Sequence, residues 1–338
     1  MPSRIEQYEQ AALRGVAWLL NHQRTDGSFS DVGDGVQPYH KIPYALAISG
    51  HRYEASRVLD WVVSHAMTPE GDLNSKDVQT ACDWYDRFYT YANSWIVLGA
   101  AQLGRCDVVG KGNEYILKHL DASGGIFSQV HSDTQYCRRQ DIVSTSKAGS
   151  ACLSAGRIHE AVLIGDWFIR LIKAQPDMDT VLYTCWDPDR GLITSFPESD
   201  SLTYAVYTAA SLQWFYYPGI AMEFLNKLYQ ITGRRKYLEA SRRCFDFACR
   251  CGKRILRTDP GAIIGPAAAL MYRIDGNPRC HDVAVAVGDS LVSKQTAAGF
   301  WFKQDEADST EHAHRHLLEL EGTAEFVVWL TDIVRCLQ

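Results

Sequence analysis

The stretch from Trp18 to Phe29, WLLNHQRTDGSF, is the first copy of a pattern that recurs along the chain. In each copy, the end of a helical segment is followed by a short loop that contains Gly. Close copies are WVVSHAMTPEGDL at 61–73, YILKHLDASGGIF at 115–127 and LVSKQTAAGFWF at 291–302, and looser copies begin at Trp167 and Phe247. Six copies of one pattern predict a chain built from six helix-pair repeats.

A second helix lies between successive copies and ends in small residues, Gly and then a basic residue. Examples are ALAISGHR, VLGAAQLGR, ACLSAGR, KLYQITGRR and LMYRIDGNPR. Gly at this position suits the left-handed residue that ends a helix. Some of these second helices are rich in Ala, Gly and Ser, which lets helices pack closely around an axis. We therefore predict an all-α fold, an (α/α)6 toroid with an inner and an outer ring of helices, the alternative being an open superhelix of stacked pairs.

The composition is that of an ordinary globular protein, with 338 residues of which 46% are hydrophobic and 22% charged. We expect one domain spanning residues 1–338. A net charge of −6 disfavours nucleic acid as a partner. No apolar run is long enough to span a membrane, and we expect no secretory signal because the start MPSRIEQYEQ is polar. We expect a cytoplasmic protein whose ten cysteines form neither disulfides nor a zinc site. The sequence leaves its oligomeric state open.

The first copy, read as Arg14-Gly15-x-x-Trp18-Leu19-x-x-x-Gln23-x-x-x-Gly27-x-Phe29, resembles the QW repeat of terpenoid cyclases and protein prenyltransferases. The last copy keeps Gln295, Gly299 and the final Trp301. The resemblance implies that Gln and the aromatic residue tie each outer helix to the loop after it. A weaker similarity to six-hairpin glycosidases lies in GIAMEFLNKLYQITGRRKYLEASRR, from Gly219 onward.

The sequence resembles the cyclase family in its repeat but lacks the catalytic motifs of that family. The nearest string to the D-x-D-D acid of class II cyclases is Asp177-Met-Asp179-Thr180, which lacks the last carboxylate. The aspartate clusters of class I cyclases and the zinc ligands of prenyltransferases are also missing from the sequence. No phosphate-binding loop, dinucleotide motif or G-x-S-x-G is present. We therefore predict an enzyme without a cofactor.

The candidate site lies where the first turns of the inner helices meet, because their unpaired N–H groups and dipoles favour an oxygen-rich ligand. The polar groups there that suit proton transfer or stabilisation of charge are Tyr39, His40, Asp86, Arg87, Tyr91 and His316, our candidate catalytic residues. Candidate substrate-binding residues at the same positions are Trp84, Tyr89, Asp141, Lys147 and His312. His312 and His316 share a helix face with Glu319 one turn further on, a spacing that could hold a metal, but no comparably clear ligand stands elsewhere in the sequence, so we predict no metal.

The connection at about 176–217 is much longer than the others and dense in aromatic residues. It supplies two more candidate binding residues, Trp214 and Tyr217. Long connections in compact domains are usually lids or binding elements. We expect a lid over an apolar or aromatic small molecule, with packing over the ring end as the alternative.

Three functions fit these features. The first is a natural-product biosynthetic enzyme that binds an unsaturated terpenoid or polyketide-derived substrate and promotes its cyclisation, by a pericyclic route or by acid–base cyclisation or isomerisation. The second is an intracellular glycan hydrolase or lyase, with a carboxylate pair such as Asp86 and Asp141. The third is a helical scaffold that binds a partner protein.

Overall fold

The computed structural model describes residues 2–29, 35–73, 87–129, 138–211, 213–257, 259–302 and 312–338. Helices dominate this part of the chain and fall into two compact units. The first unit comprises Met1–Lys118 and Gly288–Gln338, and the second comprises His119–Val287. Helix α14 (Pro278–Lys294) contributes to both.

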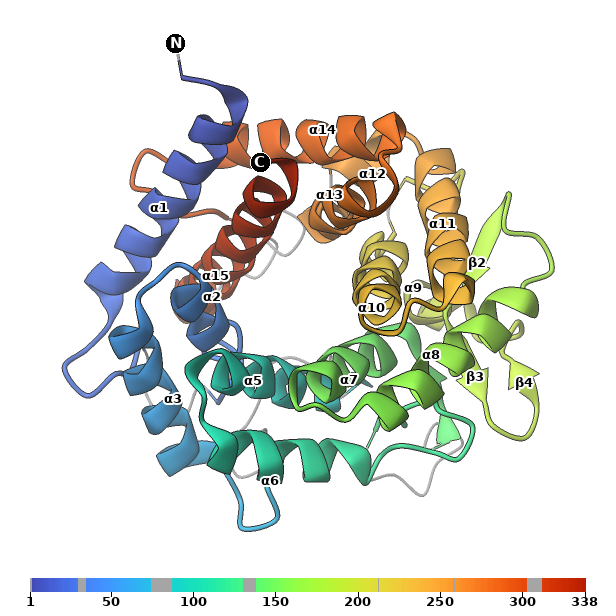
Figure 1. The fold of residues 1–338 in the computed structure, drawn as a ribbon, viewed down its shortest axis with the longest axis horizontal. Coiled ribbons are helices and arrows are strands. Elements are labelled where there is room, and N and C mark those ends of the chain that lie inside the picture. The colour runs from blue at the N-terminus through green and yellow to red at the C-terminus, as the bar shows by residue number, and fades with distance from the viewer. Residues whose placement is uncertain are drawn as a thin grey trace. The chain divides into compact units, whose positions relative to one another are not determined.

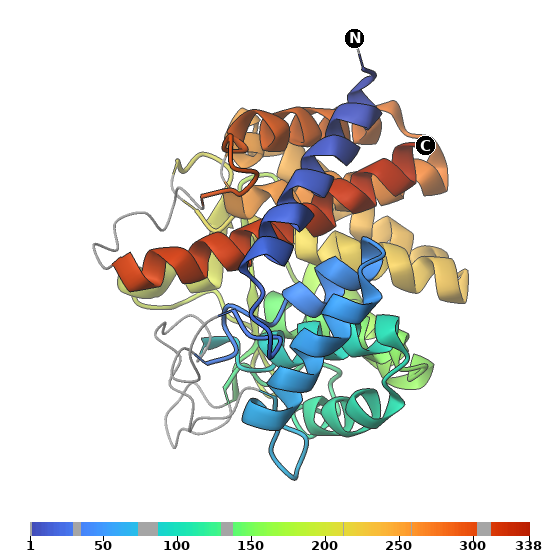
Figure 2. The ribbon, with the colours of Figure 1, turned by 90° about the vertical axis from the view of Figure 1, so that its left-hand side faces the viewer.

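The first unit consists of two layers of helices (Figure 1). Its inner layer contains α2 (Ile42–Ile48), α5 (Thr90–Leu103) and α15 (His312–Leu337), and α2 packs against the other two. The outer layer contains α1 (Arg4–His22), α3 (Arg52–Ala66) and α6 (Cys106–Leu117). Figure 2 shows α1 crossing over α15. We call a layer inner when its helices are buried along most of their length.

The second unit repeats this arrangement (Figure 1). Its inner helices are α7 (Ile142–Ser154), α10 (Tyr216–Thr232) and α13 (Ile264–Asp275), with α10 packed between the other two. The outer helices are α8 (Ile158–Lys173) and α11 (Arg235–Arg250). Two short helices, α12 (Lys253–Arg257) and η4 (Asp259–Ile263), connect α11 to α13.

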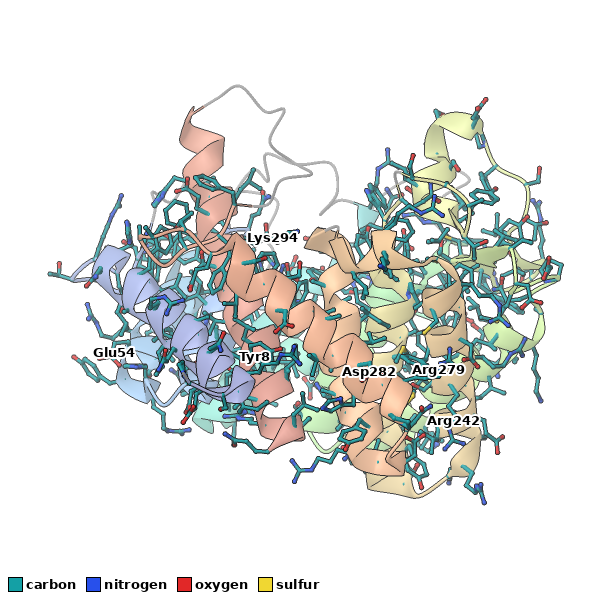
Figure 3. All side chains as sticks on the ribbon, turned by 90° about the horizontal axis from the view of Figure 1, so that it is seen from above. Tyr8, Glu54, Arg242, Arg279, Asp282 and Lys294 are labelled. Atoms are coloured by element: carbon teal, nitrogen blue, oxygen red, sulfur yellow. The ribbon has the colours of Figure 1, made fainter. Side chains whose placement is uncertain are left out.

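Small residues bring these helices close together, as the composition of the inner helices predicted. A Cβ on Gly149 of α7 would overlap the ring of Phe224 on α10, and one on Gly99 of α5 would overlap Pro43 of α2. Figure 3 shows Tyr8 of α1 near α14, where a Cβ on Gly288 would meet its ring and where its hydroxyl donates to Asp289 Oδ1 at 2.7 Å.

The Gly of each close repeat copy has a left-handed backbone, with φ from 85° to 98° at Gly27, Gly71, Gly124 and Gly299. A Cβ at any of these positions would collide with a backbone carbonyl of another outer helix. Two residues further on, the backbone N–H donates to a side-chain oxygen of an inner helix or, for Tyr39, of the segment just before one. The pairs are Phe29 with Tyr39, Leu73 with Asn93, Ile126 with Thr145 and Trp301 with Thr323. The same pair of contacts, from Gly to an outer helix and from the N–H two residues later to a side-chain oxygen, thus occurs in all four close copies.

The glutamines of the repeat act as the resemblance implied. Gln23 Nε2 donates to the carbonyl of Gly27 in its own loop at 3.4 Å and to that of Glu54 on α3 at 3.0 Å. Gln295 Nε2 donates in the same way to Gly299 at 2.7 Å and to Ala11 of α1 at 2.8 Å. Each glutamine therefore joins its loop to another outer helix as well.

We expect Gly124→Ala to lower the free energy of unfolding by at least about 2 kcal/mol, because a left-handed backbone costs about 1–2 kcal/mol and the new Cβ meets the carbonyl of Leu163. Urea unfolding measures the change. Gly156→Ala is the matched control, since Gly156 ends α7 with φ 72° and nothing lies within 4 Å of its Cβ position. Equal losses in the two variants would mean that the contact contributes nothing.

The connection after α8 contains secondary structure that the sequence did not predict. Strands β2 (Val181–Tyr183) and β5 (Ala205–Tyr207) form one antiparallel pair. Strand β3 (Cys185–Asp187) pairs with β1 (Gln140–Asp141) and with β4 (Gly191–Leu192). Along the chain, η3 (Glu198–Asp200) and α9 (Ser201–Tyr204) lie between β4 and β5. Because β1 leads directly into α7, these strands fix the start of that inner helix.

Candidate functional site

A polar cluster in the first unit joins the segment before α2 to α15. Lys41 Nζ lies 2.7 Å from Glu321 Oε1 and 2.9 Å from Glu325 Oε1. The three side chains are at most 9% exposed. The three charged groups depend on one another, because removing one partner of a buried ion pair leaves an uncompensated charge. We call these residues, together with Gln37, His40 and Tyr91, the Lys41 cluster.

His40 is the titratable base of this cluster. Burial, together with the neighbouring Lys41 ammonium, lowers the pKa of His40 to about 3, although Glu321 opposes both. The imidazole is therefore neutral at physiological pH. Its Nδ1 lies 2.6 Å from the carbonyl oxygen of Gln37, which can only accept, so Nδ1 carries the proton. Nε2 is then the basic nitrogen, and it faces Glu321 Oε1 at 4.0 Å.

Aromatic rings border the cluster. The Tyr91 ring lies edge-on to His40 with centroids 5.7 Å apart, and Lys41 Nζ lies 5.6 Å from its centre. Trp95, one turn further along α5, packs edge-on against Tyr91 and Tyr44. A neutral base, a carboxylate and an ammonium beside aromatic rings can transfer a proton and hold a charge that develops on oxygen.

The second unit has a polar group at the start of α7. Asp141 is fully buried and caps this helix, accepting from the Ser144 N–H at 2.8 Å and from Ser128 Oγ at 2.5 Å. Burial raises the pKa of Asp141, although Arg139 and the two serines oppose it. Asp141 is thus first a helix cap. Tyr217, in the first turn of α10, is also buried, and its hydroxyl donates to the carbonyl of Thr203 at 3.0 Å.

Lys147 lies further along α7 and binds Glu223 of α10. Its Nζ is 2.7 Å from Glu223 Oε2, and Lys227 Nζ is 2.7 Å from the other oxygen. Burial alone would raise the pKa of Glu223, but the two ammonium groups lower it to about 2. The carboxylate stays ionised and joins two inner helices.

This lowered pKa makes stability depend on pH. The ordinary pKa of the group is 4.5 and the folded value is about 2, so its contribution is complete above pH 4.5 and is lost as the pH falls toward 2. We expect Glu223→Gln to be less stable than the original at pH 6, with a gap that narrows as the pH falls from 4.5 to 2. Urea unfolding across this range measures it. The exposed Glu239→Gln is the control and should show a much smaller gap; a gap independent of pH would contradict the prediction.

The other predicted site residues lie in several places. Tyr39 stacks on Trp61 at 4.4 Å and its hydroxyl accepts from the Phe29 N–H, so it belongs to the repeat contact. The Tyr89 hydroxyl donates to Asp72 at 2.6 Å, and Arg87 is half-buried before α5. His316 packs edge-on against Trp18 of α1.

Of the four remaining predicted site residues, the structure describes the side chain of one. Trp214 stacks on Tyr216, with centroids 5.9 Å apart. Trp84, Asp86 and the His312 side chain lie outside the described residues, so the predicted pair of Asp86 and Asp141 has no measured separation. Of the predicted catalytic residues, His40 and Tyr91 are brought together by the structure.

Sequence reasoning missed both carboxylates of the Lys41 cluster. Glu321 and Glu325 stand four residues apart in EGTAEFVVWL, so they share one helix face within a run of small and apolar residues. Charges at that spacing inside an otherwise buried helix were the available signal. Glu223, which also escaped notice, stands in a similar context in GIAMEFL.

No protein-family model matches the sequence, and no curated protein matches it. Solved structures do match. An α-mannanase of glycoside hydrolase family 76 from Bacteroides thetaiotaomicron is 15% identical with a TM-score of 0.66, covering 97% of this chain and 96% of its own. A D-mannose isomerase is 12% identical with a TM-score of 0.65, covering 95% and 97%. A type II terpene cyclase from Scytonema, in complex with geranylgeranyl dihydroxybenzoate, is 12% identical with a TM-score of 0.60, covering 98% and 99%.

The fold is an α/α toroid. This confirms the predicted fold class and both resemblances, to terpenoid cyclases and to six-hairpin glycosidases. Identities this low establish the fold alone. Within the described ranges, none of the helices has the length and apolarity needed to cross a bilayer. Across the same residues, no three His, Cys, Asp or Glu side chains are grouped as metal ligands would be.

Proposed function

We propose that this chain is a cofactor-independent enzyme that cyclises or isomerises an unsaturated, oxygen-bearing small molecule by proton transfer at the Lys41 cluster. The observation that carries the proposal is His40. A histidine that is neutral and held in one tautomer presents an unprotonated nitrogen that can accept a proton, and the Glu321 carboxylate raises its pKa against the effects of burial and Lys41. Of the routes considered from the sequence, this favours acid–base chemistry over a pericyclic reaction.

The other members of the cluster support this base. When His40 Nε2 takes a proton from the substrate, the Glu321 carboxylate partly offsets burial and the Lys41 ammonium, which both disfavour the charged ring. Lys41 holds the Glu321 carboxylate in place. The proton on Nε2 exchanges with solvent, and a proton from the same nitrogen is then delivered to a second substrate atom, so the molecular formula is unchanged. Tyr91 and Trp95 provide an apolar wall for an unsaturated skeleton.

The test uses a panel of substrates in heavy water. The purified protein is incubated in D2O with geranylgeranyl dihydroxybenzoate, which the similar terpene cyclase binds, with linear polyenes and with D-mannose. Proton-transfer cyclisation or isomerisation gives an isomer that carries solvent deuterium at carbon. A product without deuterium would favour a pericyclic route, and the absence of any isomer from the whole panel would contradict the proposal.

A specific observation favours glycan hydrolysis as a second candidate. The contacts of 2.7 and 2.9 Å that Glu321 and Glu325 make to one nitrogen keep these two oxygens within 5.6 Å of each other. Retaining glycosidases place their carboxyl groups about 5–5.5 Å apart. One of them must be a protonated acid, however, and a shared Lys41 favours two ionised groups, so we place this candidate second.

Hydrolysis and isomerisation are separated by the source of oxygen. An α-1,6-mannotetraose, the ligand of a similar family 76 mannanase from Salegentibacter, is incubated with the protein in water labelled with oxygen-18. Hydrolysis gives shorter sugars with one labelled oxygen. Unchanged tetrasaccharide would rule out cleavage of this linkage and leave the isomerase proposal untouched.

A further inference from the structure

The second unit contains a cavity of about 230 Å³ between α11, α12, α13 and α14. Its walls are mainly apolar and include Ala248, Ile255, Leu256, Ile264 and Val283. Ala248, Ile255 and Ile264 are buried, while Leu256 and Val283 are half-exposed. None of the residues of the Lys41 cluster lines it, so the proposed catalytic function does not explain this cavity.

The size of the cavity limits its ligand. An apolar cavity of about 150 Å³ stays dry and takes up benzene. A cavity of about 230 Å³ is half as large again, and its lining includes the exposed residues Gly252 and Lys253, so it accommodates a chain of roughly eight carbons. Apolar walls favour the hydrocarbon part of such a ligand.

The charge at the mouth selects the head group. Lys253 lines the cavity and is exposed to solvent, and it makes no ion pair with any of the described residues. Its neighbour Arg254 donates to the carbonyls of Thr208 and Ala209 instead. A cation at the open end of an apolar cavity complements an amphiphile with an anionic head.

We propose that this cavity binds a small amphiphilic carboxylate, with the hydrocarbon chain between α11 and α13 and the carboxylate beside Lys253. The site is independent of the Lys41 cluster. Cys249, a half-buried residue of the cavity lining, reports on its occupancy. An occupied cavity shields this thiol from reagents.

Calorimetry with three probes of one chain length tests the head group. We expect octanoate to bind saturably at one site, about two- to five-fold more tightly than 1-octanol, which is the range that one exposed charge pair contributes. Octylammonium should bind most weakly. Lys253→Gln should remove the preference for octanoate, whereas Lys173→Gln, on the exposed face of α8, should retain it. No saturable binding of octanoate, or a preference that survives Lys253→Gln, would overturn the proposal.

Thiol labelling places the ligand independently. Saturating octanoate should slow alkylation of Cys249 by N-ethylmaleimide, as followed by peptide mass spectrometry, and leave the exposed Cys106 of the first unit unchanged. Val283→Phe fills the cavity from a half-exposed position and should abolish binding in a protein with normal thermal unfolding. If Val283→Phe binds octanoate as before, or if octanoate protects Cys106 equally, the ligand is not in this cavity.

Discussion

Replacing His40 by Gln should lower turnover by a factor of about 10² to 10⁴, which is the usual contribution of a general base. Gln keeps much of the volume of the buried imidazole, and its amide can still donate to the Gln37 carbonyl, but it cannot accept a proton at neutral pH. Turnover and deuterium incorporation are measured together on whichever substrate of the panel reacts. We expect both to fall in parallel.

His65→Gln is the matched control for this change. His65 stacks on Trp61 at the exposed surface of α3 and is not a member of the Lys41 cluster, and its replacement should leave turnover within about two-fold. Stability against pH gives a second readout that does not need a substrate. The folded pKa of His40 is about 3 and its ordinary value is 6.5, so this residue costs stability as the pH falls below 6.5. His40→Gln should flatten that part of the profile; unchanged turnover would show that His40 is not the base.

The fold was readable from the sequence because its signals are local. Gly27 and Gly299 mark loops that need a left-handed residue against a backbone carbonyl, and Gln23 and Gln295 bond within four residues of their own position. Such contacts leave a pattern of fixed spacing that repeats. The strands of the connection after α8 left none, because elements of two or three residues are too short to show an alternation of polar and apolar residues.

Only part of the site could be predicted from the sequence, because its contacts join residues that are far apart in the chain. The start of α2 identified His40, since the ends of inner helices are where polar groups accumulate. The partners of this segment come from far along the chain, since Lys41 and Glu321 are separated by 280 positions. The ring geometry does not say which residues of a long helix such as α15 reach Lys41. Asp141 was chosen for its polarity and Tyr217 for its place in the aromatic-rich connection, and in the structure each makes a hydrogen bond to a backbone group.

Replacing Lys41 by Met should lower the free energy of unfolding by about 3–5 kcal/mol at neutral pH, as expected when one partner of a buried ion pair is removed. Met fits the volume of the lysine chain, so the loss comes from the two carboxylates, Glu321 and Glu325, whose oxygens were held by one ammonium group. Urea unfolding at pH 7 measures it. The deficit should narrow toward pH 4, because protonation removes the charges that Lys41 no longer neutralises.

Two companion variants separate this electrostatic cause from a packing defect. Adding Glu321→Gln and Glu325→Gln to Lys41→Met removes the uncompensated charges and should recover most of the lost stability. Replacing all members of a buried ionic group by uncharged residues often changes the free energy of unfolding little. Lys227→Met is the control: Lys227 is 31% exposed in its ion pair with Glu223, so its loss should cost less than about 1 kcal/mol. A Lys41→Met protein as stable as the original, or a triple variant no better than the single one, would mean that Lys41 does not hold the two carboxylates together, and the orientation of Glu321 toward His40 would need another cause.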